Sequence, residues 1–222
     1  MKSPESGTTA RRPLLAAAAA AAIALAAAPA GCVDVLTGRE VPETRFYSLD
    51  PRLPERPSAE PQPVALRVER VEADPTARRI DLVLRKKEPS QEVVPFLYHR
   101  WVAMPDVFVG ERLREHLFAT GLFARVVAAG EKTPCDFRLE SRLTRLEGVE
   151  TESGTEGVIV LEIALFEASG DERECFRHRV EKRSPAAGSS PAEIADALAA
   201  ALRDLLDDVA RRVDFGIRSV RS

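Results

Sequence analysis

The pattern that most constrains the fold is a long amphipathic segment near the C-terminus. It begins with Ser190-Pro191-Ala192-Glu193, which has the form of a capping box with proline at the first helical position. Apolar residues then recur at helical spacing along one face: Ile194, Leu198, Ala201, Leu205 and Val209. A helix with one apolar face must bury that face against another element. The rest of the chain is therefore expected to supply an apolar surface.

Alternating apolar and polar residues predict β-strands in the first half of the chain. These strands are expected at residues 64–71, 80–85, 93–102 and 123–127. The charged turn at 86–91 should join the second and third strands into a hairpin. A first helix is expected at 106–120, with Asp106 as its cap and Gly121 just past its end. Its apolar stripe should contain Val109, Leu113 and Leu117, widened by Phe118.

The pattern of apolar residues in the second half of the chain predicts three further strands in a meander. Residues 136–146 alternate, 158–166 are apolar on both faces, and 175–182 provide a partner strand, so the middle segment should be central. The acidic stretch 147–156 is expected to be a loop. With the two helices, this pattern predicts an α+β fold: a single, mostly antiparallel sheet with two helices packed on one face.

Residues 1–31 have the features of an export signal and are set apart from the fold. Lys2, Arg11 and Arg12 form a basic start, and Leu14–Ala28 is an unbroken apolar run of 15 residues. A membrane-spanning helix needs about 20 apolar residues. The run is short for a span and fits the apolar region of a signal peptide.

The three residues Ala30-Gly31-Cys32 resemble the end of a bacterial lipobox. In such a sequence the cysteine is acylated and becomes the new N-terminus, so Cys32 is the expected lipidation site. Val33 follows it, and the sorting rule that the resemblance implies then favours the outer membrane. The alternative is plain secretion with cleavage near Ala28 or Ala30, which would leave Cys32 an ordinary residue.

Residues 32–63 are expected to form a tether, because six of the sixteen prolines lie there and proline-rich segments are extended and semi-rigid. Within the tether, residues 45–49 alternate like a short strand. The folded domain is then expected at 64–216, with 217–222 as a tail.

Composition and motifs argue against nucleic-acid binding and against a local catalytic site. The chain has 32 basic and 35 acidic residues and only 5% aromatic residues, which disfavours a nucleic acid as partner. The sequence contains no recognisable nucleotide-binding, hydrolase or metal-binding motif. We expect no catalytic residue, no metal and no cofactor. The open alternative is an enzyme whose site assembles from distant residues such as His116 and Cys135.

Cys135 and Cys175 form an even pair in an exported chain, which is compatible with a disulfide. The predicted meander places them two strands apart and displaced along the sheet. Their Cα atoms would then exceed the roughly 7 Å limit for a disulfide, which favours two free thiols.

The segment Tyr98-His99-Arg100-Trp101 carries the only tryptophan of the chain. Tyr98, Arg100 and Trp101 are candidates for a partner interface, because aromatic and arginine side chains often anchor interfaces. The alternative is that Trp101 packs in the core beneath the first helix.

In their order along the chain, these short motifs resemble the ABC-type transport auxiliary lipoprotein family, which is PqiC-like. The motifs are the lipobox ending at Cys32, Phe46-Tyr47-Ser48-Leu49, the strand 64–71, Ile80-Asp81-Leu82-Val83-Leu84-Arg85, Tyr98-His99-Arg100-Trp101, the helix with Leu113 and Leu117, Gly121-Leu122-Phe123 and Asp136-Phe137-Arg138-Leu139.

The resemblance implies a membrane-anchored, periplasm-facing, non-enzymatic accessory of an MCE-type ABC transport system. Such systems move phospholipid or other hydrophobic molecules between the inner and outer membranes. The implied partners are the membrane, through the lipid anchor, an MCE-family periplasmic protein, the ABC permease and ATPase, and phospholipid as a candidate ligand. The alternatives are a cofactor of another envelope machine, such as a peptidoglycan synthase, and a secreted enzyme.

Overall fold

The computed structural model describes residues 42–54, 60–87, 90–168 and 172–222. The fold described here is that of the unit Glu43–Ser222. The expected signal peptide and Cys32 lie outside the described residues. Within the described ranges, no helix has the length and apolar character needed to cross a membrane.

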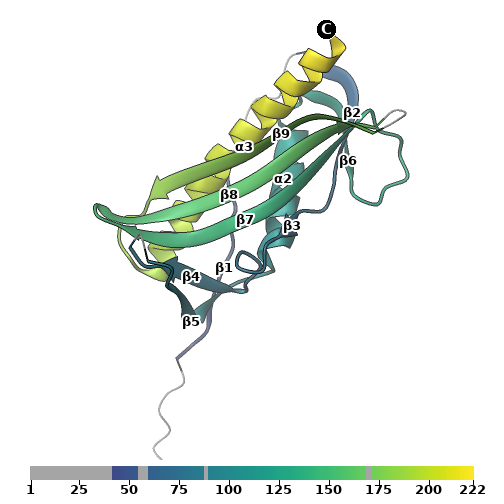
Figure 1. Ribbon diagram of the computed structural model, residues 1–222. Helices are drawn as coiled ribbons and strands as arrows, with labels where there is room; N and C mark the ends of the chain where they lie inside the picture. Colours follow the sequence, from purple (N-terminus) through teal and green to yellow (C-terminus); the bar gives the residue numbers. More distant parts are fainter. Residues whose placement is uncertain (1–41, 55–59, 88–89, 169–171) are drawn as a thin grey trace, which may run out of the picture. The chain divides into compact units, whose positions relative to one another are not determined.

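The centre of the sheet is an antiparallel meander of three long strands (Figure 1). The strand β7 (Phe137–Thr151) pairs along its whole length with β8 (Gly154–Glu167), and β9 (Arg173–Pro185) pairs with the other edge of β8. The predicted meander is confirmed, with β8 as its central strand.

The other edge of β7 is shared by three short strands that run parallel to it. From the start of β7 to its end, they are β2 (Gln62–Val68), β3 (Glu72–Ala73) and β4 (Asp81–Arg85). Each occupies only a few residues of β7, so the sheet divides into two wings beyond this edge.

Three more strands extend these wings. The strand β6 (Phe123–Ala128) pairs in parallel with β2, β5 (Val93–Trp101) pairs antiparallel with β4, and β1 (Arg45–Tyr47) pairs in parallel with β5. The predicted hairpin of the second and third strands is confirmed as β4 and β5. Because the longest ladders are antiparallel, the sheet is mixed but mostly antiparallel.

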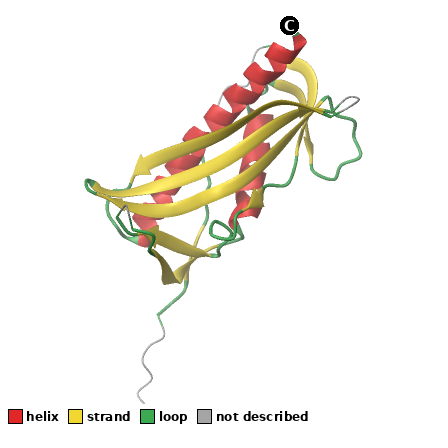
Figure 2. Cartoon of the chain, viewed as in Figure 1, coloured by secondary structure: helices red, strands yellow, loops and turns green. Residues whose placement is uncertain are grey.

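The two described helices, α2 (Pro105–Ala119) and α3 (Pro191–Arg221), cover one face of this sheet (Figure 2). The predicted α+β fold is therefore confirmed. At the start of α3, the Glu193 N–H donates to the Ser190 hydroxyl, and the Glu193 carboxylate accepts from the Ser190 N–H. This is the predicted capping box, and it satisfies backbone donors that the first helical turn leaves unpaired.

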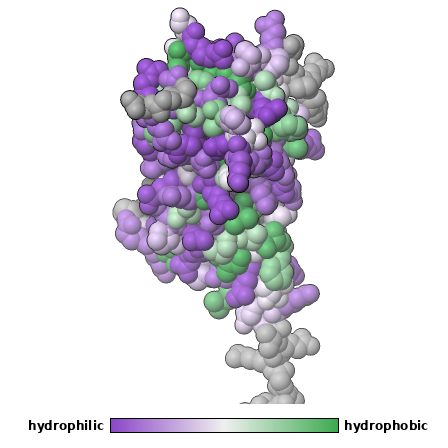
Figure 3. Space-filling view, turned by 90° about the vertical axis from the view of Figure 1, so that its right-hand side faces the viewer, coloured by the Kyte–Doolittle hydropathy of each residue, from purple (hydrophilic) through white to green (hydrophobic). Residues whose placement is uncertain are grey.

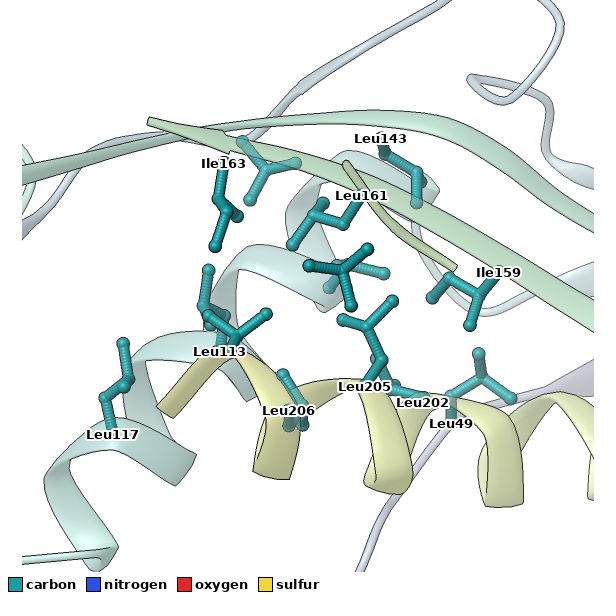
Figure 4. Close-up of a cluster of buried hydrophobic side chains, with 14 of the residues drawn as sticks. Leu49, Leu113, Leu117, Leu143, Ile159, Leu161, Ile163, Leu202, Leu205 and Leu206 are labelled. Carbon is teal, nitrogen blue, oxygen red and sulfur yellow. The ribbon is translucent and has the colours of Figure 1, made fainter. Parts of the chain in front are cut away.

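The core lies between the sheet and both helices. Side chains of β7 and β8, such as Leu143 and Leu161, point toward Leu205 of α3 and Leu113 of α2 (Figure 4). A glycine lets α3 approach the hairpin end of the sheet: a Cβ atom on Gly157 would lie 2.6 Å from the backbone nitrogen of Leu198. Close packing of this kind leaves no room for a larger residue.

The first helix differs from its prediction at its start. Pro105 stands at the first helical position and Met104 at the cap, without a side-chain cap hydrogen bond. Asp106 is therefore not the cap, and its Oδ2 instead lies 3.1 Å from Nε of Arg78. The predicted end is confirmed, because Gly121 has a φ of 61°, which favours glycine just past a helix. Phe118 does not widen the buried stripe, since it turns away from the core and is exposed.

The stretch 147–156 is not the predicted loop. Strands β7 and β8 continue through it as a regular ladder that includes Gly148 opposite Gly157, and they turn only between Thr151 and Gly154. The loop was predicted from acidic composition, which does not exclude a strand. Glu147 is held by two arginine side chains, so its charge is compensated inside the sheet.

The folded domain also extends beyond the expected limits of 64 and 216. Leu49 is buried in the core, and Gln62 already belongs to β2, so the expected tether contributes to the domain. The expected tail continues α3 to Arg221, with Ile217 fully buried. Apolar contacts with the core hold these residues in the domain. Proline content and position near the end of the chain do not reveal such contacts.

Candidate functional surfaces

The described residues do not assemble a metal centre or a nucleophilic pair. They contain no group of three or more histidine, cysteine or acidic side chains that could hold a metal ion. Cys135 and Cys175 are both free thiols, one before β7 and the other in β9. Burial raises the pKa of the Cys175 thiol, which disfavours the reactive thiolate.

His116 lies between the two helices and is 1% exposed. Its Nε2 atom is 3.1 Å from Oδ1 of Asp207 on α3, although neither ring nitrogen makes a hydrogen bond. Burial lowers the pKa of His116, and the nearby Asp207 carboxylate opposes this shift. The imidazole is therefore a packed contact between helices and is closed to a substrate.

A small apolar cluster of Val149, Val158 and Val160 is fully buried apart from the main core. Gly148 and Gly157 face α3, so their neighbours Val149 and Val158 point to the opposite face of the sheet. These valines are covered there by charged side chains rather than by a helix.

Glu147 is the centre of that charged cover and pairs with Val158 across the ladder. Its carboxylate accepts two hydrogen bonds from Arg85, of 2.8 and 3.0 Å, and one of 2.7 Å from Arg145. Arg183 opposite Val158 and Glu181 opposite Val160 add a second ion pair at 2.9 Å. We call this set of side chains the charged roof: Arg85, Arg145, Glu147, Glu181 and Arg183.

A groove of about 770 Å³ lies between β9 and the C-terminal half of α3. Phe176 and Phe215 line it together with Arg211 and Arg212. Asp208 in the groove is contacted by Lys182 at 2.9 Å and by Arg212 at 3.1 Å. Burial works against ionisation of Asp208, but the hydrogen bonds from these two cations lower its pKa. The Asp208 carboxylate is thus paired with cations from both β9 and α3.

The three predicted interface residues Tyr98, Arg100 and Trp101 do not share one surface. Trp101 is only 2% exposed, and its ring lies 5.6 Å from that of Phe108 in α2. It therefore packs in the core beneath the first helix, which was the alternative expectation. Tyr98 and Arg100 remain accessible, and Arg100 lies 3.1 Å from Asp81.

The register of β1 on β5 explains why Trp101 is buried while Arg100 is accessible. Tyr47 pairs with Trp101 and shares its core-facing side, whereas Phe46 pairs with Arg100 and faces outward. Val102 follows on that outward side, and its N–H donates to the Tyr47 carbonyl at 2.9 Å.

A bulge in β5 exposes further apolar side chains. Asp81 pairs with Arg100, but Val83 pairs with Pro95, so β5 advances by five residues while β4 advances by two. The extra residues include Leu97, which is 71% exposed. Phe46 and Val102 are 62% and 58% exposed. We call Phe46, Leu97, Tyr98 and Val102 the β1–β5 patch.

Most of the β1–β5 patch carries no signal in the sequence. Phe46, Leu97 and Val102 lie in segments that alternate like ordinary strands, so their exposure depends on register and on the bulge. On the face drawn in Figure 3, one group of hydrophobic residues lies low on the domain, above the grey trace, and another lies near the top. The only available signal was Tyr98, beside Leu97 in an otherwise regular strand pattern.

The sequence matches the family model of the ABC-type transport auxiliary lipoprotein component over residues 47–210. The chain belongs to that family. The matched span begins in β1 and ends within α3, so it covers nearly all of the sheet, all of α2 and most of α3. As an auxiliary lipoprotein component of ABC transport, the protein is assigned to the cell envelope. Cys32 lies outside the matched span. A comparison with curated proteins found no match.

Solved structures with the same fold support the assignment of architecture. Protein XCC0632 from Xanthomonas campestris, of the DUF330 family, superposes with a TM-score of 0.70 at 18% identity, covering 80% of this chain and 99% of that chain. A hypothetical protein, CT253 from Chlamydia trachomatis, superposes with a TM-score of 0.50 at 7% identity, covering 69% of this chain and 96% of that chain. At these identities the likeness shows the fold alone.

Proposed function

We propose that this auxiliary lipoprotein is a non-enzymatic adaptor of an MCE-type ABC transport system that moves phospholipid or other hydrophobic molecules between the inner and outer membranes. The family match over residues 47–210 carries the proposal. The adaptor would bring an MCE-family periplasmic protein, and through it the permease and ATPase, to the membrane that holds the anchor.

The proposed anchor is an acylated Cys32. A basic start, an apolar run and two small residues precede it, as expected for a lipoprotein signal. Acyl chains contribute about 0.8 kcal/mol per buried CH₂, and more than one chain is needed for stable attachment. Val33 supports sorting to the outer membrane.

The distribution of reactive side chains supports a non-enzymatic role. His116 is sealed between helices, and the raised pKa of Cys175 keeps this thiol protonated. Neither arrangement provides the exposed nucleophile and base that covalent catalysis requires.

The first test concerns the anchor. We expect mass spectrometry of the full-length chain, purified from its native envelope, to find an acylated Cys32 as the N-terminus. Cys32→Ala should abolish acylation and release the protein from washed outer membranes. Cys135→Ala removes another thiol and serves as the matched control, with acylation unchanged. An unmodified Cys32 or a different start would overturn the anchor.

The second test concerns the partner. Affinity purification of the full-length chain after crosslinking in cells should recover an MCE-family protein with its permease and ATPase. Recovery of a peptidoglycan synthase in their place would overturn the proposed transport role. The Cys32→Ala variant tests whether this recovery depends on the anchor, because it keeps the same folded domain.

A further inference from the structure

We propose that the β1–β5 patch docks on the surface of the membrane that holds the lipid anchor, so that the folded domain rests on the bilayer in a fixed orientation. This inference rests on the anchoring part of the proposed function. Anchoring alone would leave the domain free to rotate about its tether. The patch would add a second, weaker attachment at a defined place.

The composition of the patch suits a bilayer interface. Phe46, Leu97 and Val102 are mostly exposed apolar side chains, and Tyr98 adds a ring with a polar end. Aromatic and aliphatic side chains of this kind settle at the boundary between headgroups and acyl chains.

The patch follows the proposed anchor closely in the sequence. The chain enters the described domain immediately before β1, and only ten residues separate Cys32 from Glu43. At 3.3–3.6 Å per residue, this connection spans at most about 40 Å. The patch is therefore the part of the domain that follows the anchor most directly in the chain.

The geometry of the edge favours a membrane over a protein strand as the occupant. Strand β1 has three residues, which is too short to offer a long row of backbone groups to a partner strand. The apolar side chains instead project outward from Phe46 and Val102, and from the bulge at Leu97. A bilayer accepts such side chains without a matching surface.

The test uses the full-length chain in its native envelope with a photoreactive benzoylphenylalanine in place of one residue. Phe46 and Leu97 are the test positions. Phe118 in α2 and Phe215 in α3 are matched controls, because they are 70% and 73% exposed but lie outside the patch. After irradiation, phospholipid adducts are quantified by mass spectrometry of the modified peptides, and protein adducts by their shift on gels.

We expect phospholipid adducts at positions 46 and 97 to exceed those at 118 and 215 at least fivefold. Equal yields at all four positions, or protein adducts alone at 46 and 97, would overturn the membrane contact. Protein adducts alone would show that the patch is a partner interface. A probe at Val102 gives an independent reading if one substitution prevents folding.

The same samples separate this inference from the proposed anchor. Mass spectrometry of the N-terminus reports whether Cys32 is acylated. Acylated protein without lipid adducts at the patch refutes docking and leaves the anchor intact. Lipid adducts on protein that lacks acylation support docking and refute the anchor. As a further check, Phe46→Glu with Leu97→Glu should lower the adduct yield at Val102 several-fold, whereas Phe118→Glu with Phe215→Glu should leave it unchanged.

Discussion

Two groups of apolar side chains outside the main core differ in their exposure to solvent. Val149, Val158 and Val160 are completely covered by the charged roof. In the β1–β5 patch, Phe46 and Leu97 are left open to solvent although arginines lie nearby. The long side chains that cover the valines show that this fold can shield apolar residues without a helix. The uncovered patch is therefore a distinct surface property of the domain.

The largest expected effect concerns the core side of β5. Trp101→Ala removes a buried ring that packs on Phe108 and should lower the free energy of unfolding by about 3–5 kcal/mol. Tyr98→Ala, three residues earlier on the exposed side, should lower it by less than about 1 kcal/mol. Urea unfolding of the purified chain in detergent measures both. Similar losses for the two variants would contradict the division of β5 into a core side and an open side.

The next largest effect should come from the charged roof. Glu147→Ala leaves Arg85 and Arg145 without their shared carboxylate over a buried cluster. Breaking a fully buried pair costs about 3–5 kcal/mol, and the partial exposure of both arginines reduces the expected loss to about 2–3 kcal/mol. The matched control is Glu150→Ala, which removes a solvent-accessible pair with Lys86 and should lower stability much less than Glu147→Ala does. Equal changes would mean that the roof does not stabilise the valine cluster.

A smaller effect should appear in the pH dependence of stability. Because the pKa of His116 is lowered on folding, the unfolded chain takes up this proton first as the pH falls. The contribution is fully present above the ordinary histidine pKa of about 6.5 and is lost as the pH falls toward the lowered folded value. This loss has a limiting slope of about 1.4 kcal/mol per pH unit.

The His116→Leu variant tests this assignment in unfolding experiments between pH 7.5 and 5. Its stability should fall less steeply with decreasing pH than that of the parent protein. A parallel slope for His116→Leu would refute the role of His116.

The smallest effect on stability should come from the patch itself. Phe46→Ser combined with Leu97→Ser changes side chains that are already mostly exposed, so the free energy of unfolding should change by about 0.5 kcal/mol or less. Urea unfolding provides the measurement. A loss above about 2 kcal/mol would show that the patch is packed in the folded domain and would remove the contrast with the valine cluster.

Local patterns predicted the type of most elements because backbone periodicity is written in neighbouring residues. Residues 158–166, which are apolar on both faces, predicted the central strand, and Gly121 marked the end of α2. Patterns failed where a distant partner decided the outcome. The acidic run after Leu146 became a strand because Arg85, from another part of the chain, compensates Glu147.

The candidate surface was predictable only in part for the same reason. Tyr98 and Arg100 were identified from sequence, but the burial of Trp101 and the exposure of Leu97 depend on the register of β5 with its two neighbours. Register sets which residues face the core, and a bulge changes that assignment locally. No local pattern reports either feature.

By itself, the sequence determined the α3 capping box and the positions of most strands along the chain, because each depends on residues close together in the chain. The tertiary structure alone decided that three short strands share one edge of β7, that Glu147 covers buried valines, and that the β1–β5 patch stays open. These features join segments far apart in the sequence. Their energies arise from contacts that exist only once the sheet has formed.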